Sequence, residues 1–431
     1  MIVSFQATIR IRESACGFGR ALLVPSVAAL LLLLLHADVL HAQESDELQL
    51  FGSMQTIFFH QDSRMTIDSP TENIHFTGSE SRSTFALQQM DLFFRKEMSD
   101  NFTAFVDLEF QLNYSSEKHW GSLSLQEAWM NYHVSDALNI KTGLLYPAFN
   151  QLNEIKNRLA LQPYLFRPLI YERLLSSKFL AEDFIPEHAF IQISGMVPFG
   201  DFFAEYAVYT GNAESSYITQ SAPSGGIDTD VNENFEFLSG VDPTAIKFKL
   251  FGGRIGLQSR NEQLKCGLSV THDYNNLRDS SATPIHLVTS EARSLFDKDA
   301  SRWRFGADFS YRLGPAFIDA EMIQVLYDSK RAAEQKFELE QSFLHTMVGY
   351  DIAYPLTVYG SLQWSDYTFG LDADYFVYSA GAAYRINSDI GAKAQVIVYE
   401  ETYKNDPQAL TIPYNQKVTI TFFFLGFSVL L

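Results

Sequence analysis

Residues 105–112 read FVDLEFQL, and the side chains in this stretch alternate between two classes. Residues 102, 104, 106, 108, 110 and 112 are all apolar, whereas Asp107, Glu109 and Gln111 fall between them, joined only by Phe105. Successive side chains of a strand point to opposite faces. The segment therefore predicts a strand with one apolar face and one face that carries two carboxylates.

The same alternation recurs along the chain. It is found in QEAWMNYHV (126–134), SRWRFGADFSYRLG (301–314) and VYSAGAAYRI (377–386), where the apolar face often carries an aromatic residue near its ends. The final stretch, KVTITFFFLGFSVLL (417–431), places Val418, Ile420, Phe422 and Phe424 on one side. Aromatic residues at both ends of an apolar face are typical of strands that cross a membrane.

The connections between these segments have two lengths that take turns. Seven are short and rich in Gly, Pro, Asn, Asp or Ser, at 98–101, 134–139, 198–201, 259–263, 312–316, 353–357 and 386–390. Eight are longer and polar, at 60–80, 114–121, 147–186, 212–245, 275–300, 328–336, 366–373 and 403–412. Together they predict an all-β fold, a transmembrane antiparallel β-barrel of about 16 strands with short turns on one side and long loops on the other.

A soluble sandwich or propeller is the competing fold, because its strands also alternate, with the apolar face buried. Three features favour the barrel: the alternating short and long connections, the apolar carboxyl terminus and the amino-terminal segment. In a membrane barrel, Phe110 and its apolar neighbours face lipid, and Asp107, Glu109 and Gln111 face a wet interior.

The amino-terminal segment has the features of a secretory signal peptide. Arg10, Arg12 and Arg20 precede an uncharged apolar run over residues 21–35, and the small residue Ala42 follows where cleavage is expected. This run is shorter than the ~20 residues of a membrane-spanning helix. We therefore expect a signal peptide at 1–42 and a barrel at 43–431, located in the bacterial outer membrane.

Composition excludes several other classes of function. The formal net charge of −19 argues against a nucleic-acid partner, which requires a basic surface. Cys16 lies in the expected signal peptide and leaves Cys266 alone, so no intramolecular disulfide is expected. The sequence contains no nucleophile elbow, P-loop or zinc-protease motif. We therefore expect no enzyme activity, no cofactor and no metal site.

Three segments resemble a known family: LQEAWMNYHVSDALNIKTGLLYPAFNQ (125–151), HAFIQISGMVPFGDFFAEYAVYTGNA (188–213) and FGGRIGLQ (251–258). They are similar to the phosphate-selective porin O/P type family of bacterial outer-membrane porins. The resemblance implies a sixteen-stranded channel, often a homotrimer, that sits in outer-membrane lipid and lets small hydrophilic solutes or ions diffuse passively. Phosphate itself is not expected as the solute, because the chain is acidic and has no basic run. A barrel enzyme of lipase or protease type, or a non-conducting scaffold or adhesin, remains open.

The family's third external loop folds into the lumen and narrows it. The third loop here, 147–186, is the longest, and its charges lie among many apolar residues. We expect it to form a constriction, although an external lid or a contact between subunits would also shelter its apolar groups. The charged residues expected to act there are Glu154, Lys156, Arg158, Arg167, Glu172, Arg173 and Lys178.

The polar members of the alternating strands are the candidates for the pore wall. Charged side chains along a pore set which ions enter it. A second interpretation of each is an ion pair across the wall that only braces the barrel. The candidates are Arg95, Asp107, Glu109, Glu127, Asn131, Lys141, Arg254, Arg302, Arg304, Asp308, Arg385 and Lys393.

Overall fold

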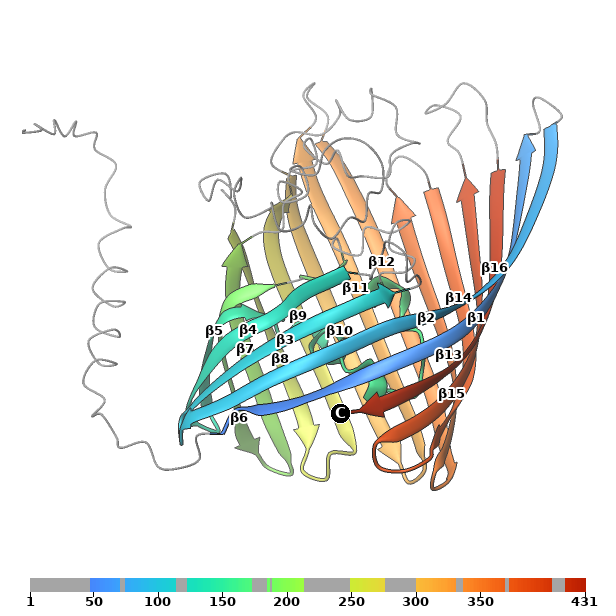
Figure 1. The fold of residues 1–431 in the computed structure, drawn as a ribbon. Helices are drawn as coiled ribbons and strands as arrows, with labels where there is room; N and C mark the ends of the chain where they lie inside the picture. Colours follow the sequence, from blue (N-terminus) through green and yellow to red (C-terminus); the bar gives the residue numbers. More distant parts are fainter. Residues whose placement is uncertain are drawn as a thin grey trace, which may run out of the picture. The chain divides into compact units, whose positions relative to one another are not determined.

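The computed structural model describes residues 47–69, 74–113, 122–172, 184–186, 188–212, 249–275, 300–330, 336–368, 372–404 and 415–431. These residues form a closed antiparallel barrel of sixteen strands, in which each strand pairs with its neighbours in the chain and β1 pairs with β16 (Figure 1). The predicted fold class and strand number are confirmed.

The strands are β1 Gln49–Ser69, β2 Ile74–Ser99, β3 Phe102–Asn113, β4 Ser122–Ser135, β5 Leu138–Leu145, β6 Ala189–Phe199, β7 Phe202–Asn212, β8 Lys249–Ser259, β9 Leu264–Asn275, β10 Ala300–Leu313, β11 Ala316–Lys330, β12 Lys336–Ala353, β13 Leu356–Thr368, β14 Asp372–Arg385, β15 Ile390–Lys404 and β16 Asn415–Leu430. The described part of the connection from β5 to β6 contains α2 Asn150–Ile155, η1 Leu159–Leu161 and η2 Leu169–Tyr171. In the described ranges, no helix is long and apolar enough to cross a membrane.

The seven predicted short turns lie where the sequence placed them, between β2 and β3 and at every second junction after it. Two of them contain a glycine in the left-handed region, Gly200 with φ of 59° and Gly314 with φ of 58°. Glycine adopts this conformation without the steric penalty of a Cβ atom, so these turns close tightly.

The predicted first connection, 60–80, is wrong. β1 continues to Ser69 and β2 begins at Ile74, so most of this segment is paired strand. The register runs without interruption from Thr56 to Ser69, and the Ser63 hydroxyl donates to the Glu80 carbonyl across the pair at 3.2 Å. Polar side chains on both faces hid the hairpin, because backbone pairing in water does not require an apolar face.

The two faces of the wall differ in exposure as the alternation predicts. Apolar residues on the outer face are exposed, for example Phe85 at 73% and Leu268 at 60%. Their neighbours on the inner face are covered, for example Arg304 at 0%. The outward-facing set of β10, with Trp303, Phe305 and Phe309 all exposed, is the set that the sequence assigned to lipid.

One β-bulge interrupts the pairing of β1 with β2, and another interrupts the pairing of β3 with β4. Gln89 lies opposite Gln55 and Leu87 lies opposite Thr56, so Gln88 has no partner on β1. In the same way, Gln126 on β4 is an extra residue opposite the step from Asp107 to Leu108. A bulge shifts the alternation by one residue, so consecutive side chains can point to the same face.

Candidate functional site

The described part of the connection from β5 to β6 lies within the barrel (Figure 1). It first reaches β9 and β10, where the Asn150 amide donates to the Ser269 hydroxyl at 3.1 Å. A Cβ atom at Gly306 would lie only 2.2 Å from Asn150 Oδ1, so the missing side chain of this glycine makes room for the loop. The described residues of the predicted 147–186 loop then continue across to β1, β13 and β15.

Glutamine side chains of the wall bind the backbone of this loop. Gln55 and Gln88 both donate to the Leu165 carbonyl, at 2.9 and 2.7 Å. The amides of Leu165 and Phe166 donate to Gln395 Oε1, at 2.9 and 2.8 Å. Buried irregular backbone must find hydrogen-bond partners, and these uncharged groups supply them at low desolvation cost.

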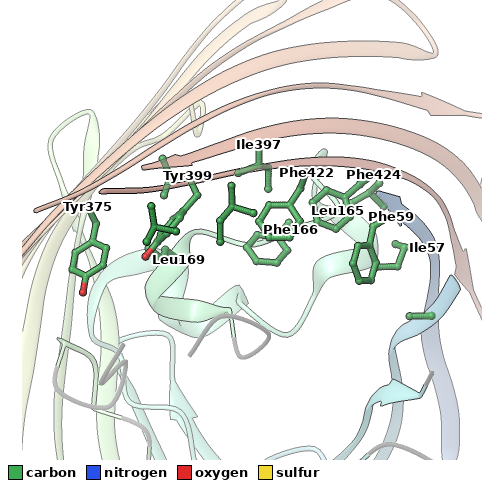
Figure 2. Packing of buried hydrophobic residues seen from close by; sticks show 14 residues of the cluster. Ile57, Phe59, Leu165, Phe166, Leu169, Tyr375, Ile397, Tyr399, Phe422 and Phe424 are labelled. Carbon is green, nitrogen blue, oxygen red and sulfur yellow. The ribbon is translucent and has the colours of Figure 1, made fainter. Parts of the chain in front are cut away.

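The fastened segment also buries apolar side chains. Figure 2 shows Leu165, Phe166 and Leu169 packed against inward-pointing residues of β1, β14, β15 and β16. The Phe166 ring lies 5.5 Å from the Phe424 ring, measured between centroids. Burial of side chains of this size stabilises by about 1.5–3 kcal/mol each. This part of the inner wall is therefore apolar, unlike the wet interior that the sequence predicted beside Asp107 and Glu109.

The apolar residues of the last strand point inward. Val418, Ile420, Phe422 and Phe424 are buried against the loop, and the exposed outer face of β16 consists of the intervening residues Phe423, Leu425 and Phe427. β16 is thus apolar on both faces, because one face meets the exterior and the other meets the loop.

Lys393 was expected at the pore wall, but it lies beneath the loop. Its side chain is only 6% exposed. Its ammonium group donates to the carbonyls of Leu159 at 3.0 Å and Ala160 at 3.1 Å, and to Gln55 Oε1 at 3.2 Å. The structure therefore gives this lysine the geometry of a fastener for the loop and not that of an open lining charge.

Arg167 of the loop meets the carboxylates of β2 and β3. Its guanidinium lies 3.3 Å from the Glu109 carboxylate, and both side chains are buried. Burial alone would lower the pKa of Arg167, but the carboxylates of Glu109, Glu172 and Asp91 outweigh it and hold the pKa above its ordinary value. Glu109 and Arg167, predicted separately for wall and loop, thus form one ion pair.

Further acidic residues surround this ion pair. Asp91 accepts from the Gln89 amide at 2.8 and 2.9 Å. Glu127 accepts from the Trp129 indole at 3.1 Å and from the Tyr146 backbone amide at 3.4 Å. Asp107 is buried beside them, and within the described residues its Oδ1 atom has no hydrogen-bond partner.

Two of the predicted arginines share one aspartate on β9. Arg302 donates to both Asp273 oxygens, at 2.8 and 2.6 Å, and Arg304 donates to one of them at 3.1 Å. All three side chains are buried. Arg254 forms a similar pair with both oxygens of Asp308, at 3.2 and 2.7 Å, and also contacts Glu205 at 3.2 Å. These contacts match the bracing interpretation of the wall charges.

The other four wall candidates lie nearer the short turns. Arg95 pairs with Glu97 at 2.6 Å. Lys141 stands 4.7 Å from the centroid of the Trp129 ring and lies opposite Asn131 across β4 and β5. Arg385 is exposed beside the turn, with its guanidinium 5.6 Å from the Tyr354 ring.

The loop charges fall into two groups. Arg167 and Glu172 are buried, whereas Glu154 and Arg158 are exposed. The Lys156 ammonium lies 4.1 Å from the centroid of the Tyr146 ring. Arg173 and Lys178 lie outside the described residues.

Two recesses remain between the loop and the short turns. The first is lined by Lys141, Glu154, Glu205 and Arg254, among others. The second is lined by loop residues 160–163 together with wall charges that include Arg312, Asp351 and Arg385. Both contain acidic and basic groups. Across the described ranges, no three His, Cys, Asp or Glu side chains are grouped as a metal ion would require.

The sequence analysis missed the glutamines that fasten the loop. Gln88 and Gln89 are adjacent in the sequence and both are buried, which simple alternation forbids. The pair of adjacent amides was the available signal for a bulge. The roles of Gln395 and Asp273 could not be read from local sequence, because their partners are distant in the chain.

Comparison with known proteins supports the fold. No family model matches the sequence, and no curated protein matches it. The structure is similar to that of Salmonella typhi OmpF in complex with daunomycin, with a TM-score of 0.50 and 10% identity over 90% of this chain and 98% of that one. Less similar are in-vitro folded OmpT, an outer membrane protein of Vibrio cholerae (TM-score 0.49, 11% identity, 92% and 100% covered), and an anion-selective porin from Comamonas acidovorans (0.46, 12%, 90% and 100%). The likeness to OmpF shows the barrel fold of an outer-membrane porin.

Proposed function

We propose that this chain is a porin of the bacterial outer membrane, through which small hydrophilic solutes or ions diffuse passively. One observation carries the proposal: a closed barrel has an apolar outer surface and an inner wall that bears charged and amide groups around open recesses. A closed barrel satisfies all its backbone groups, so such a wall is stable in lipid. Passive diffusion requires no catalytic group.

The loop 147–186 supports a channel of restricted width. Its described residues cross the lumen and are held on several strands by Gln55, Gln395 and Lys393. A segment held at so many points would narrow the passage, and the recesses beneath it are lined by polar and charged groups. We assign the constriction to this segment and the export signal to residues 1–42.

The resemblance to the phosphate-selective porin O/P type family is retained as part of the proposal, but phosphate is not retained as the solute. The buried arginines among the described residues, Arg167, Arg302 and Arg304, all contact a carboxylate. A ladder of arginines without counter-ions would attract phosphate, whereas each of these arginines already contacts a carboxylate. A homotrimer is the expected assembly, which the mass of the detergent-solubilised protein would check.

Recording from the purified full-length protein in a planar lipid bilayer tests the function. Stepwise increases in current at constant voltage are expected, and the reversal potential in a salt gradient would give the charge preference. A silent bilayer, obtained with protein whose barrel is shown to be folded by circular dichroism, would refute the channel. That result would favour the enzyme or the non-conducting scaffold.

A further inference from the structure

Four aromatic rings form a continuous strip on the inner wall of β1–β4, near the short turns. Phe51, Phe93, Phe105 and Trp129 come from four consecutive strands, which lie side by side in Figure 1. Successive ring centroids are 5.2, 5.8 and 5.0 Å apart. Phe105 is the residue that interrupts the polar face of the stretch FVDLEFQL, so the strip explains the exception in that pattern.

The two β-bulges turn two of these rings inward. On β2, Phe85 is exposed on the outer face, so unbroken alternation would place Phe93 there as well. On β4, Leu125 is exposed on the outer face, and unbroken alternation would place Trp129, four positions later, on that face too. The extra residues Gln88 and Gln126 shift the alternation by one position. Phe93 therefore shares the inner face with buried Asp91, two positions before it. Trp129 shares the inner face with Glu127, which accepts a hydrogen bond from the Trp129 indole N–H. Bulges that re-aim side chains are common beside functional sites.

Membrane insertion does not explain this orientation. An aromatic ring on the outer face would be stabilised by lipid, whereas these rings face the lumen. Trp129 packs partly against a buried apolar cluster, but Phe51 is 40% exposed and Phe93 and Phe105 are partly exposed, so these rings are not the interior of a core. A row of exposed apolar rings in a passage for water-soluble molecules is a surface to which a solute can bind.

Polar groups flank the strip on both sides. Asp107 lies opposite Phe93 across β2 and β3, and Arg95 lies opposite Phe105. At the far end, Lys141 stands over the Trp129 ring at 4.7 Å from its centroid. A bound molecule would meet ring carbons along its centre and the hydrogen-bond donors of Arg95 and Lys141 at its edges.

We propose that this strip is a track for carbohydrate, that is, for pyranose sugars and short oligosaccharides. The proposal rests on the proposed channel function and names its solute class. A pyranose ring has an apolar C–H face and a rim of hydroxyl groups, and the strip with its flanks is complementary to both. Inorganic anions find no hydrogen-bond donor on the ring carbons, and the ammonium group of Lys141, 4.7 Å from the centroid of the Trp129 ring, disfavours a second cation on that ring.

Maltotriose block of the ion current tests the track. The full-length protein is inserted into a planar bilayer, and maltotriose is titrated while the KCl current is recorded. A saturable decrease in current is expected. Sorbitol carries hydroxyl groups but no ring, and it should reduce the current only in proportion to the viscosity that it adds.

Variants then locate the binding surface. Replacement of Phe93 and Phe105 by Ser should raise the half-blocking concentration by about three- to tenfold per ring, the range expected for one aromatic contact. Phe51→Ser, at the most exposed ring, serves if the double variant does not fold. Phe317→Ser is the matched control, because Phe317 is an inward ring of β11 near the short turns but outside the strip. Maltotriose should block this variant at the same concentration as wild type.

The outcomes separate the two proposals. Absence of any KCl current would refute the channel itself. A normal current without saturable block by maltotriose would overturn the carbohydrate track and leave the channel intact. Block that is equally strong in wild type and in the Phe93→Ser, Phe105→Ser variant would overturn it as well.

Discussion

Replacement of Arg167 by Met should detach the loop from the wall or destabilise the whole barrel. Arg167 is 4% exposed and Glu109 is 1% exposed, with 3.3 Å between the guanidinium nitrogen and the carboxylate oxygen. Removing one partner of a buried ion pair leaves the other charge without compensation, at a cost of about 3–5 kcal/mol. If the loop docks with less free energy than this, the mutant loop leaves the wall, and the single-channel current rises and becomes noisier.

Two assays measure these alternatives. Urea unfolding of the barrel in lipid vesicles, followed by tryptophan fluorescence, should give a lower midpoint with an unchanged slope if the loop stays docked. Bilayer recording should show the larger, noisier current if it does not. The second substitution Glu109→Gln should restore much of the lost stability, because it removes the uncompensated charge.

Arg158→Met is the matched control for this experiment. Arg158 belongs to the same loop but is exposed, so the free energy of unfolding should change by about 0.5 kcal/mol or less. The reasoning is refuted if Arg167→Met resembles this control in both unfolding and current. In that case the guanidinium would not be the counter-ion of Glu109 in the folded protein.

Three further substitutions have defined outcomes. Phe166→Ala should lower the free energy of unfolding by about 3–5 kcal/mol in the same urea assay, because it empties a buried site against Phe424. Gly143→Ala should prevent recovery of the folded band on unheated gels, because the new Cβ atom would lie 2.2 Å from the Ala128 carbonyl oxygen and the backbone φ is 123°. Gly360→Ala should fold normally, because the atom nearest to its new Cβ would be 3.7 Å away. Asp273→Asn should lower the free energy of unfolding by about 3–5 kcal/mol in urea, because it removes the carboxylate charge that two buried arginines share.

Local sequence was enough to predict the seven short turns and most of the strands. The seven short turns follow from residues such as Gly200 and Gly314, whose preferences act within a few positions. The alternation of period two is equally local, so the outer face of β10 was assigned correctly. The hairpin of β1 and β2 was missed because its polar outer half is held by backbone pairing, which leaves no trace in the side-chain pattern.

The contents of the lumen could not be predicted in the same way. Gln395 is 230 positions from Leu165, whose backbone amide it binds, so the alternation of side chains along a strand gives no information about this contact. Bulges at Gln88 and Gln126 also reverse the faces of everything that follows them on their strands. Alternation therefore placed charges on the inner wall but did not show which of them pair with each other and which remain open to solvent.

This distinction limits what composition says about ion selectivity. The net charge of −19 suggests attraction of cations. However, many of the described charged side chains on the inner wall form ion pairs, such as Arg167 with Glu109 and Arg254 with Asp308. A buried pair presents little field to a passing ion, because the two charges cancel within a few ångströms. Selectivity should depend instead on the exposed groups of the recesses, such as Glu154, and these are of both signs. A channel built in this way discriminates weakly by charge, which leaves apolar contacts as the wall's stronger means of choosing among neutral solutes.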